Sequence, residues 1–217
     1  MLSRFFDRKP EPTPGAAQSA LSGPKFPRHS GAWDQLRKQL VAAPGLRVLD
    51  VGITSAANIN LLTNLGHSVY LADFIQDSIS GEWRLDKDSG GAQVWDMEGF
   101  ANSSLKFAGR NFDIVLLWMA LDYLPEPFLV PVVNGLYEAM VPGGKLLCVF
   151  NTKMTPDVAP HFRFHVTLTD LVEFQAAQPV RLQRALTNRN IERLFAQWSG
   201  LKQFLAKDGV SEAIITR

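Results

Sequence analysis

The feature that most constrains the fold is an alternation of apolar, strand-like runs with segments of helical period. The run LRVLDVG (46–52) has the continuous apolar character of a strand that is covered on both faces. The segment after it has Ser55 as an N-cap and Gly66 as a C-terminal stop, and HSVYLAD (67–73) reads as a second strand. Strands that alternate with helices in this way predict a parallel α/β sheet.

The alternation continues to the end of the chain. Further strands are predicted at AQVWD (92–96), FDIVLLW (112–118) and KLLCVFN (145–151), and the last helix at 187–198. The segments LKQFLA and VSEAIITR then follow, joined across Lys207-Asp208-Gly209, which carries the Asp-Gly signal of a hairpin. We therefore expect an α/β, Rossmann-like, doubly wound and mostly parallel seven-stranded sheet that ends in an antiparallel C-terminal hairpin.

The first thirty residues differ from the rest of the sequence. Prolines recur among Gly, Ala and Ser, which predicts a flexible Pro-rich N-terminal arm over 1–30 and a folded domain over 31–217. The tip of the arm carries Phe5 and Phe6, and both a docking peptide for a protein partner and a frayed terminus stay open as interpretations. Residues 152–186 are expected to form an irregular insertion that covers a substrate.

Composition excludes several classes of protein. A net charge of +1 gives no electrostatic reason to expect a nucleic-acid partner. The single cysteine, Cys148, lies in an apolar run and is expected to be a buried thiol. No apolar run approaches the roughly 18 residues of a membrane helix, and the N-terminus lacks the apolar core of a signal peptide. We expect a cytoplasmic protein without a transmembrane segment.

Acidic and aromatic residues fall at the predicted carboxyl ends of the strands, where open α/β sheets bind ligands. Three aspartates and one tryptophan share this placement: Asp50, Asp73, Asp96 and Trp118. Asp73 follows Gly52 by 21 residues, the spacing at which a carboxylate can hold ribose hydroxyls. The alternative is that Asp73 only caps the helix after it.

In order and spacing, these motifs resemble the class I S-adenosylmethionine-dependent methyltransferases from about residue 33 to residue 217. The resemblance matches the first motif to residues 50–56, the ribose-binding acid to Asp73 and the adenine-reading acid to Asp96. It also matches FDIVLLWMALDYLP to the fourth-strand motif and VPGGKLL to the turn before strand five. It implies S-adenosylmethionine as the cofactor, with these cofactor-binding residues: Asp50, Gly52, Thr54, Ser55, Asp73, Asp96 and Trp118.

The first motif departs from the pattern of the family, because Thr54 and Ala56 stand where glycines are usual. Glycine reaches positive φ freely, whereas a residue with a Cβ in the left-handed region costs about 1–2 kcal/mol. That cost disappears if the loop takes another path. Because Thr, Ser and Ala are small, their side chains need not fill the cofactor crevice. The backbone amides at the start of the helix can then bind the methionine carboxylate of the cofactor.

Methyl transfer depends mainly on positioning, which explains why no catalytic triad appears in the sequence. Asp122 and Tyr123 follow the fourth strand and are the catalytic candidates, as a base or as orienting groups for the acceptor. The alternative is that Tyr123 packs and Asp122 is solvated. His161 and His165 are four residues apart, but without a third ligand we expect no metal.

The resulting hypothesis is a methyltransferase that acts on a small molecule. Its alternative is a catalytically inactive, methyltransferase-like binding or scaffold subunit, motivated by the altered glycine loop and the Pro-rich arm. A dinucleotide oxidoreductase is disfavoured, because its G-x-G-x-x-G pattern would fall on Gly52, Thr54 and Ala57. The methyl acceptor, the atom methylated and the oligomeric state do not follow from the sequence.

Overall fold

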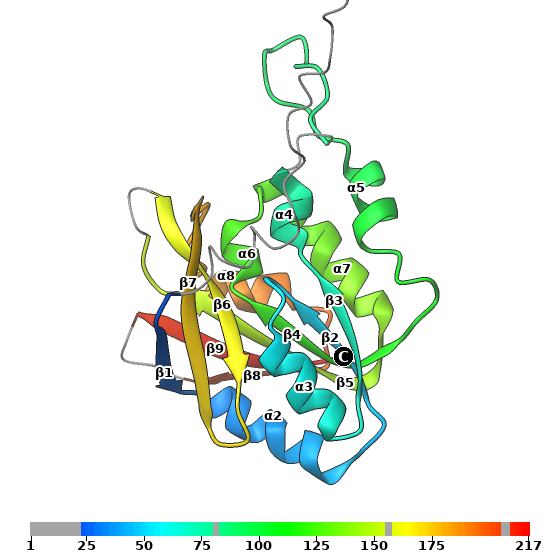
Figure 1. Ribbon diagram of the computed structural model, residues 1–217. Helices are drawn as coiled ribbons and strands as arrows, with labels where there is room; N and C mark the ends of the chain where they lie inside the picture. The colour runs from blue at the N-terminus through cyan, green and yellow to red at the C-terminus, as the bar shows by residue number, and fades with distance from the viewer. Residues whose placement is uncertain (1–22, 80–82, 155–157, 205–208) are drawn as a thin grey trace, which may run out of the picture.

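The computed structural model describes residues 23–79, 83–154, 158–204 and 209–217, and a six-stranded sheet forms its centre (Figure 1). The strand order is β3-β2-β4-β5-β9-β8, with the first four strands parallel and β9 and β8 antiparallel. The strands of this sheet are β2 (Arg47–Val51), β3 (Ser68–Ala72), β4 (Phe112–Trp118), β5 (Met140–Asn151), β8 (Gly200–Phe204) and β9 (Val210–Thr216).

Helices connect and cover these strands. They are α2 (Gly31–Ala42), α3 (Ala56–Asn64), α4 (Phe74–Ile79), α5 (Met97–Ser104), α6 (Ala120–Tyr123), the 3-10 helix η1 (Glu126–Phe128), α7 (Leu129–Ala139) and α8 (Asn188–Leu194). Hydroxyl groups start α2 and α3, because Ser30 Oγ accepts from Trp33 N and Ser55 Oγ accepts from Asn58 N. The predicted N-cap at Ser55 is confirmed.

A second, three-stranded antiparallel sheet has the order β1-β7-β6. Its strands are β1 (Lys25–His29), β6 (Val158–Val166) and β7 (Leu171–Arg181). It packs beside the main sheet, with β6 against α3 and β7 against α2 (Figure 1). The expectation of an irregular segment over 152–186 was therefore wrong, because Phe164 and Phe174 face each other across β6 and β7 as a buried pair.

Residues 25–29, which the sequence assigned to the arm, form β1 and pair with residues 171–175 of β7. Pro27 does not prevent this, since β1 is an edge strand and needs hydrogen-bond donors on one side only. Lys25 also forms an ion pair with Glu173 at 2.9 Å. The docking peptide predicted at Phe5 and Phe6 lies outside the described residues.

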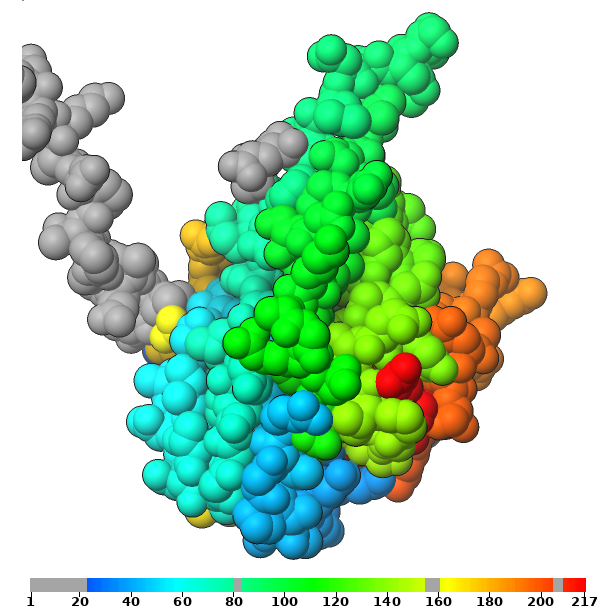
Figure 2. Space-filling view, turned by 90° about the vertical axis from the view of Figure 1, so that its right-hand side faces the viewer, coloured from blue at the N-terminus to red at the C-terminus, as the bar shows by residue number. Residues whose placement is uncertain are grey.

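The sheet has six strands in the described part of the chain, where seven were expected. The predicted strand at 92–96 forms only an isolated antiparallel bridge between Trp95 and Arg84. The aromatic rings of this region are packed on the helices, with Trp95 on Phe128 and Trp83 on Phe100 at ring-centroid distances of 5.2 and 5.7 Å. Residues 83–96, before α5, protrude from the molecule (Figures 1 and 2).

The remaining predictions on the fold have mixed outcomes. Strands β8 and β9 pair antiparallel, as expected, whereas the turn at Lys207-Asp208-Gly209 falls largely outside the described residues. Cys148 is fully buried in β5, and burial raises the pKa of its thiol. Across the described ranges, no helix is both long enough and apolar enough to cross a membrane.

Candidate functional site

The carboxyl ends of β2 and β4 lie side by side and bring Asp50 and Trp118 together. Trp118 Nε1 donates to Asp50 Oδ1 at 2.6 Å, and Asn58 Nδ2 of α3 donates to Asp50 Oδ2 at 2.9 Å. Asp50 is 4% exposed, and burial raises the pKa of its carboxyl group. Both carboxylate oxygens are thus bonded within the protein.

The turn between β2 and α3 accommodates the missing glycines without strain. Gly52 has a φ of +146°, a conformation that side chains rarely adopt. Thr54 and Ala56 are not among the residues with positive φ, so the loop takes another path and avoids the left-handed cost. Thr54 is exposed and Ser55 is fully buried, which means that only Ser55 of the two faces the protein interior.

Strand β6 lies directly against this turn. Asn58 Nδ2 donates to the Phe164 carbonyl at 3.1 Å, and Val166 N donates to Asn58 Oδ1 at 2.8 Å. Ser55 Oγ and His165 Nδ1 are 2.8 Å apart. Burial lowers the pKa of His165, which favours its neutral form at this contact. β6 therefore bonds the first turn of α3 at three points.

An aromatic stack between β4 and β6 covers the turn between β2 and α3. The rings of Trp118 and Phe164 have centroids 4.8 Å apart and planes inclined by only 8°. Both side chains are buried, at 3% and 2% exposure. Aromatic pairs of this kind contribute about 0.5–1.5 kcal/mol beyond the area they bury. Trp118 is thus engaged on its edge by Asp50 and on its face by Phe164.

The two other predicted cofactor-binding aspartates bond the helices that follow them. Asp73 Oδ1 accepts from Gln76 N at 3.0 Å, and burial is the main cause that raises the pKa of Asp73. Asp96 Oδ1 accepts from Gly99 N at 2.8 Å as the N-cap of α5. Asp73 thus bonds the start of α4, which does not decide between the two interpretations, and its ribose role and the adenine role of Asp96 stay predictions.

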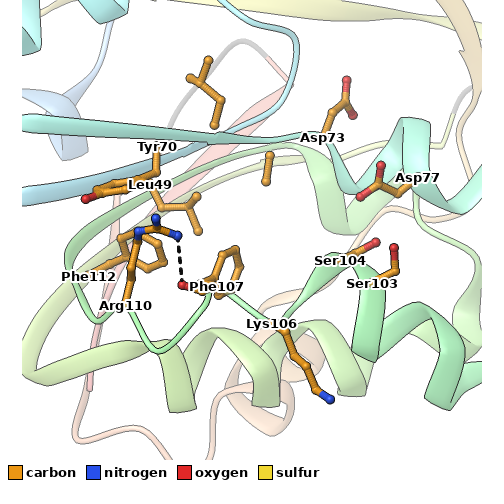
Figure 3. Close-up of a pocket in the computed structure, with 12 residues that line it drawn as sticks. Leu49, Tyr70, Asp73, Asp77, Ser103, Ser104, Lys106, Phe107, Arg110 and Phe112 are labelled. Carbon is orange, nitrogen blue, oxygen red and sulfur yellow. Dashed lines mark hydrogen bonds between the residues drawn. The ribbon is translucent and has the colours of Figure 1, made fainter.

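Asp73 also lines a cavity of about 450 Å³ beside β3 (Figure 3). Residues 70–73 all border it, and because successive strand residues face opposite sides, the cavity follows the edge of β3. In Figure 3, Arg110 lies beside Tyr70 at one end, with Asp77 towards the other end of the cavity. Its volume is in the range of small-ligand sites.

Asp122 lies between the carboxyl ends of β4 and β5. Its Oδ2 accepts from Asn151 N at 2.6 Å and from Asn151 Nδ2 at 2.9 Å. Its Oδ1 is buried and has no hydrogen-bond partner within the described structure. Burial raises the pKa of Asp122 to about 7, although the two Asn151 donors and Arg184 oppose the shift. The carboxyl group is fully buried, so the alternative of a solvated Asp122 is wrong.

Tyr123 and His161 extend this polar cluster. Their rings have centroids 5.1 Å apart, and burial raises the pKa of Tyr123 to about 12. His161 of β6 is 2% exposed, and burial lowers its pKa to about 4. His161 Nε2 is buried without a hydrogen-bond partner among the described residues. A buried polar atom left unbonded costs about 1–3 kcal/mol, so the two orphaned atoms require an explanation.

The structure groups the predicted residues in three places. Asp50, Ser55 and Trp118 meet through Asn58 and β6, Asp122 and Tyr123 meet at Asn151, and Asp73 lies at the cavity beside β3. Asn58 and Asn151 were missed, because no local pattern distinguishes an asparagine with distant partners. Within the described ranges, no three His, Cys, Asp or Glu side chains converge as metal ligands.

Comparison with solved structures shows the fold. A TehB-like SAM-dependent methyltransferase from Corynebacterium glutamicum aligns over 87% of this chain and 89% of its own, with 14% identity and a TM-score of 0.50. The PH0226 protein from Pyrococcus horikoshii aligns over 85% and 87%, with 15% identity and a TM-score of 0.50. These likenesses confirm the methyltransferase fold that the sequence motifs predict.

A third structure, TehB from Haemophilus influenzae, shares 16% identity over 87% of this chain, with a TM-score of 0.48. The chain spans 62% of the length of that protein. No protein-family model and no curated sequence matches the chain. The solved structures therefore relate this protein to methyltransferases by fold alone.

Proposed function

We propose that the protein is an S-adenosylmethionine-dependent methyltransferase that acts on a small molecule. The proposal combines the methyltransferase fold with polar side chains at the carboxyl ends of β2, β3, β4 and β5, the edge where sheets of this type bind ligands. The observation that carries it is Asp122, a buried carboxyl group whose pKa is close to neutral and whose Oδ1 is unbonded.

The predicted cofactor-binding residues are accessible at the adenosine end of the proposed site and are covered by β6 at the methionine end. At the adenosine end, Asp73 lines a cavity of ligand size and is the residue proposed to hold the ribose. At the methionine end, Ser55 and Trp118 are in contact with β6, and Asp50 is bonded by Asn58 and Trp118. This end fits the cofactor only when the contacts with β6 are broken.

Asp122 is suited to proton transfer from the acceptor. The bound cofactor supplies an activated methyl group, so the protein must orient the acceptor and remove its proton. Asn151 fixes Asp122 Oδ2 with two donors and leaves Oδ1 to take that proton. Because the pKa is about 7, a large fraction of the group is ionised near neutral pH and can act as a base.

This geometry indicates the class of acceptor. A base is needed only when the nucleophilic atom arrives protonated, so the acceptor carries an O–H or N–H group that donates to Asp122 Oδ1. His161 is neutral at physiological pH, and its unbonded Nε2 can accept or donate one further hydrogen bond according to its tautomer. Both atoms are buried, so an acceptor reaches them only after the side chains that cover them have moved.

Calorimetric titration with S-adenosylhomocysteine tests the proposal. The Asp73→Asn variant keeps a side chain that caps α4 but loses the charge that holds ribose hydroxyls. We expect measurable binding by the unchanged protein and affinity lower by roughly tenfold or more in Asp73→Asn. Asp77→Asn is the matched control, since Asp77 lines the same cavity, and its affinity should stay within about twofold. Absence of heat up to millimolar ligand, both with the unchanged protein and with a Phe164→Ala variant that lacks the ring stacked on Trp118, would contradict the proposal.

A further inference from the structure

The structure brings one of its own strands to the place where the methionine end of the cofactor is proposed to bind. Asn58 bonds the Phe164 carbonyl and the Val166 amide, and Ser55 lies at hydrogen-bond distance from His165. These are the side chains around the N-terminus of α3, where backbone amides favour a carboxylate. In this conformation the same region is filled by β6.

The contact of β6 with α3 and Trp118 is buried and closely packed. Ser55 and Asn58 are at most 1% exposed, and Phe164 covers the indole face of Trp118 at 4.8 Å. A ligand that reached Ser55 or the face of Trp118 would have to occupy the volume of Phe164 and His165. No small side-chain rotation achieves this, since the Phe164 carbonyl and the Val166 amide are also bonded to Asn58.

β6 is part of a unit held together by its own contacts. It pairs along its length with β7, and His165 Nε2 is 3.0 Å from Gln175 Oε1 on β7. Gln175 Nε2 in turn donates to the Gly23 carbonyl, just before β1. The Phe164 side chain also packs on Phe174 of β7 at 4.6 Å. Breaking the contacts between β6 and α3 therefore leaves the three-stranded sheet intact.

We propose that β6 is an autoinhibitory strand: it occupies the methionine end of the cofactor site, and cofactor binds only after β6 has left α3 and Trp118. This inference rests on the proposed function. The free protein is then the closed state, and the measured affinity equals the intrinsic affinity multiplied by the fraction of open molecules. Any change that weakens the contact of β6 with Trp118 raises that fraction and tightens cofactor binding.

The test is calorimetric titration of Phe164→Ala with S-adenosylhomocysteine. The substitution removes the stack on Trp118, and we expect binding at least about tenfold tighter than in the unchanged protein. Phe162→Ala is the matched control on the same strand, because Phe162 packs on Phe164 and Phe174. Its affinity should stay within about twofold of the unchanged protein.

Hydrogen exchange on the unchanged protein gives a second measurement that does not depend on the folding of a variant. The Val166 amide is protected by Asn58 in the closed state. With saturating S-adenosylhomocysteine, we expect faster exchange in a peptide that contains Val166, although ligand binding usually slows exchange. Unchanged or slower exchange at saturation would overturn the inference.

The outcomes separate the two proposals. Equal affinity of the unchanged protein and Phe164→Ala overturns the autoinhibitory strand and leaves the methyltransferase proposal standing. Binding by Phe164→Ala alone supports the strand and the cofactor together. Binding by neither protein overturns the proposed function, and the inference that depends on it falls with it.

Discussion

Replacement of Asp122 by asparagine should change how the stability of the protein depends on pH. Asparagine has nearly the same shape, and its Oδ1 can accept from Asn151 as Asp122 Oδ2 does. It carries no titratable group. The difference between the two proteins therefore isolates the contribution of the Asp122 carboxyl group.

The size of the effect follows from the pKa, which burial raises from 3.8 to about 7 in the folded protein. Because the folded pKa lies above the unfolded one, the folded state binds more protons in this window. The stabilisation is complete below the unfolded pKa and is lost as pH rises through about 7. At 1.36 kcal/mol per unit, the loss between about pH 4.5 and about pH 7.5 is roughly 3 kcal/mol.

Titration of His161 changes the free energy of unfolding in the opposite direction, so the unchanged protein must be compared with the Asp122→Asn variant. Burial lowers its pKa from 6.5 to about 4, so the unfolded state binds more protons between these values. The free energy of unfolding therefore rises with pH across that window and partly hides the effect of Asp122 in the unchanged protein. Both proteins contain His161, so its contribution cancels in the difference.

Urea denaturation of both proteins at constant ionic strength measures this difference. The free energy of unfolding of Asp122→Asn minus that of the unchanged protein should increase by roughly 3 kcal/mol between about pH 4.5 and about pH 7.5. A difference that stays constant within about 0.5 kcal/mol would refute the raised pKa and, with it, the argument for Asp122 as a base.

Three further predictions concern single substitutions. Once an acceptor is identified, kcat of the unchanged protein should rise with pH up to about 7. Asp122→Asn should lower kcat about 10²–10⁴-fold and abolish that rise. A pH profile of kcat that is the same in both proteins would exclude a catalytic base at this position. Ala108→Gly should raise the free energy of unfolding by up to about 1 kcal/mol in urea, because the exposed Ala108 has a φ of 52°; a loss of stability would show that the left-handed conformation is not strained. Ser30→Ala should lower the free energy of unfolding by about 0.5–2 kcal/mol, since it removes the bond to Trp33 N at the start of α2, and no change on urea titration would contradict this cap.

Elements with strong local signals could be predicted from the sequence. The apolar runs that became β2, β3 and β4 are each bounded by turn residues, and Ser55 and Gly66 mark the limits of α3. The run at 92–96 carries a weaker local signal and forms only an isolated bridge, in which Trp95 pairs with Arg84 and packs on Phe128. A weak strand propensity does not decide whether a run joins a sheet.

The contacts of the site depend on residues far apart in the sequence. Asn58 bonds positions 106 and 108 residues later, and Ser55 contacts His165 across 110 residues. Sequence reasoning placed Asp50, Ser55 and Trp118 correctly at the carboxyl ends of strands or in the turn after them. The contact of β6 with these residues was not predicted. A strand of a second sheet that packs against the turn leaves no periodic pattern in the sequence of residues 50–60.

A crystal structure of the protein grown with S-adenosylhomocysteine would show both where the cofactor binds and whether β6 moves. We predict the adenosine at the carboxyl edge of β3 with its ribose on Asp73, and Phe164 displaced from Trp118. A structure obtained at saturating ligand in which β6 still bonds Asn58 and no nucleoside contacts Asp73 would contradict this prediction.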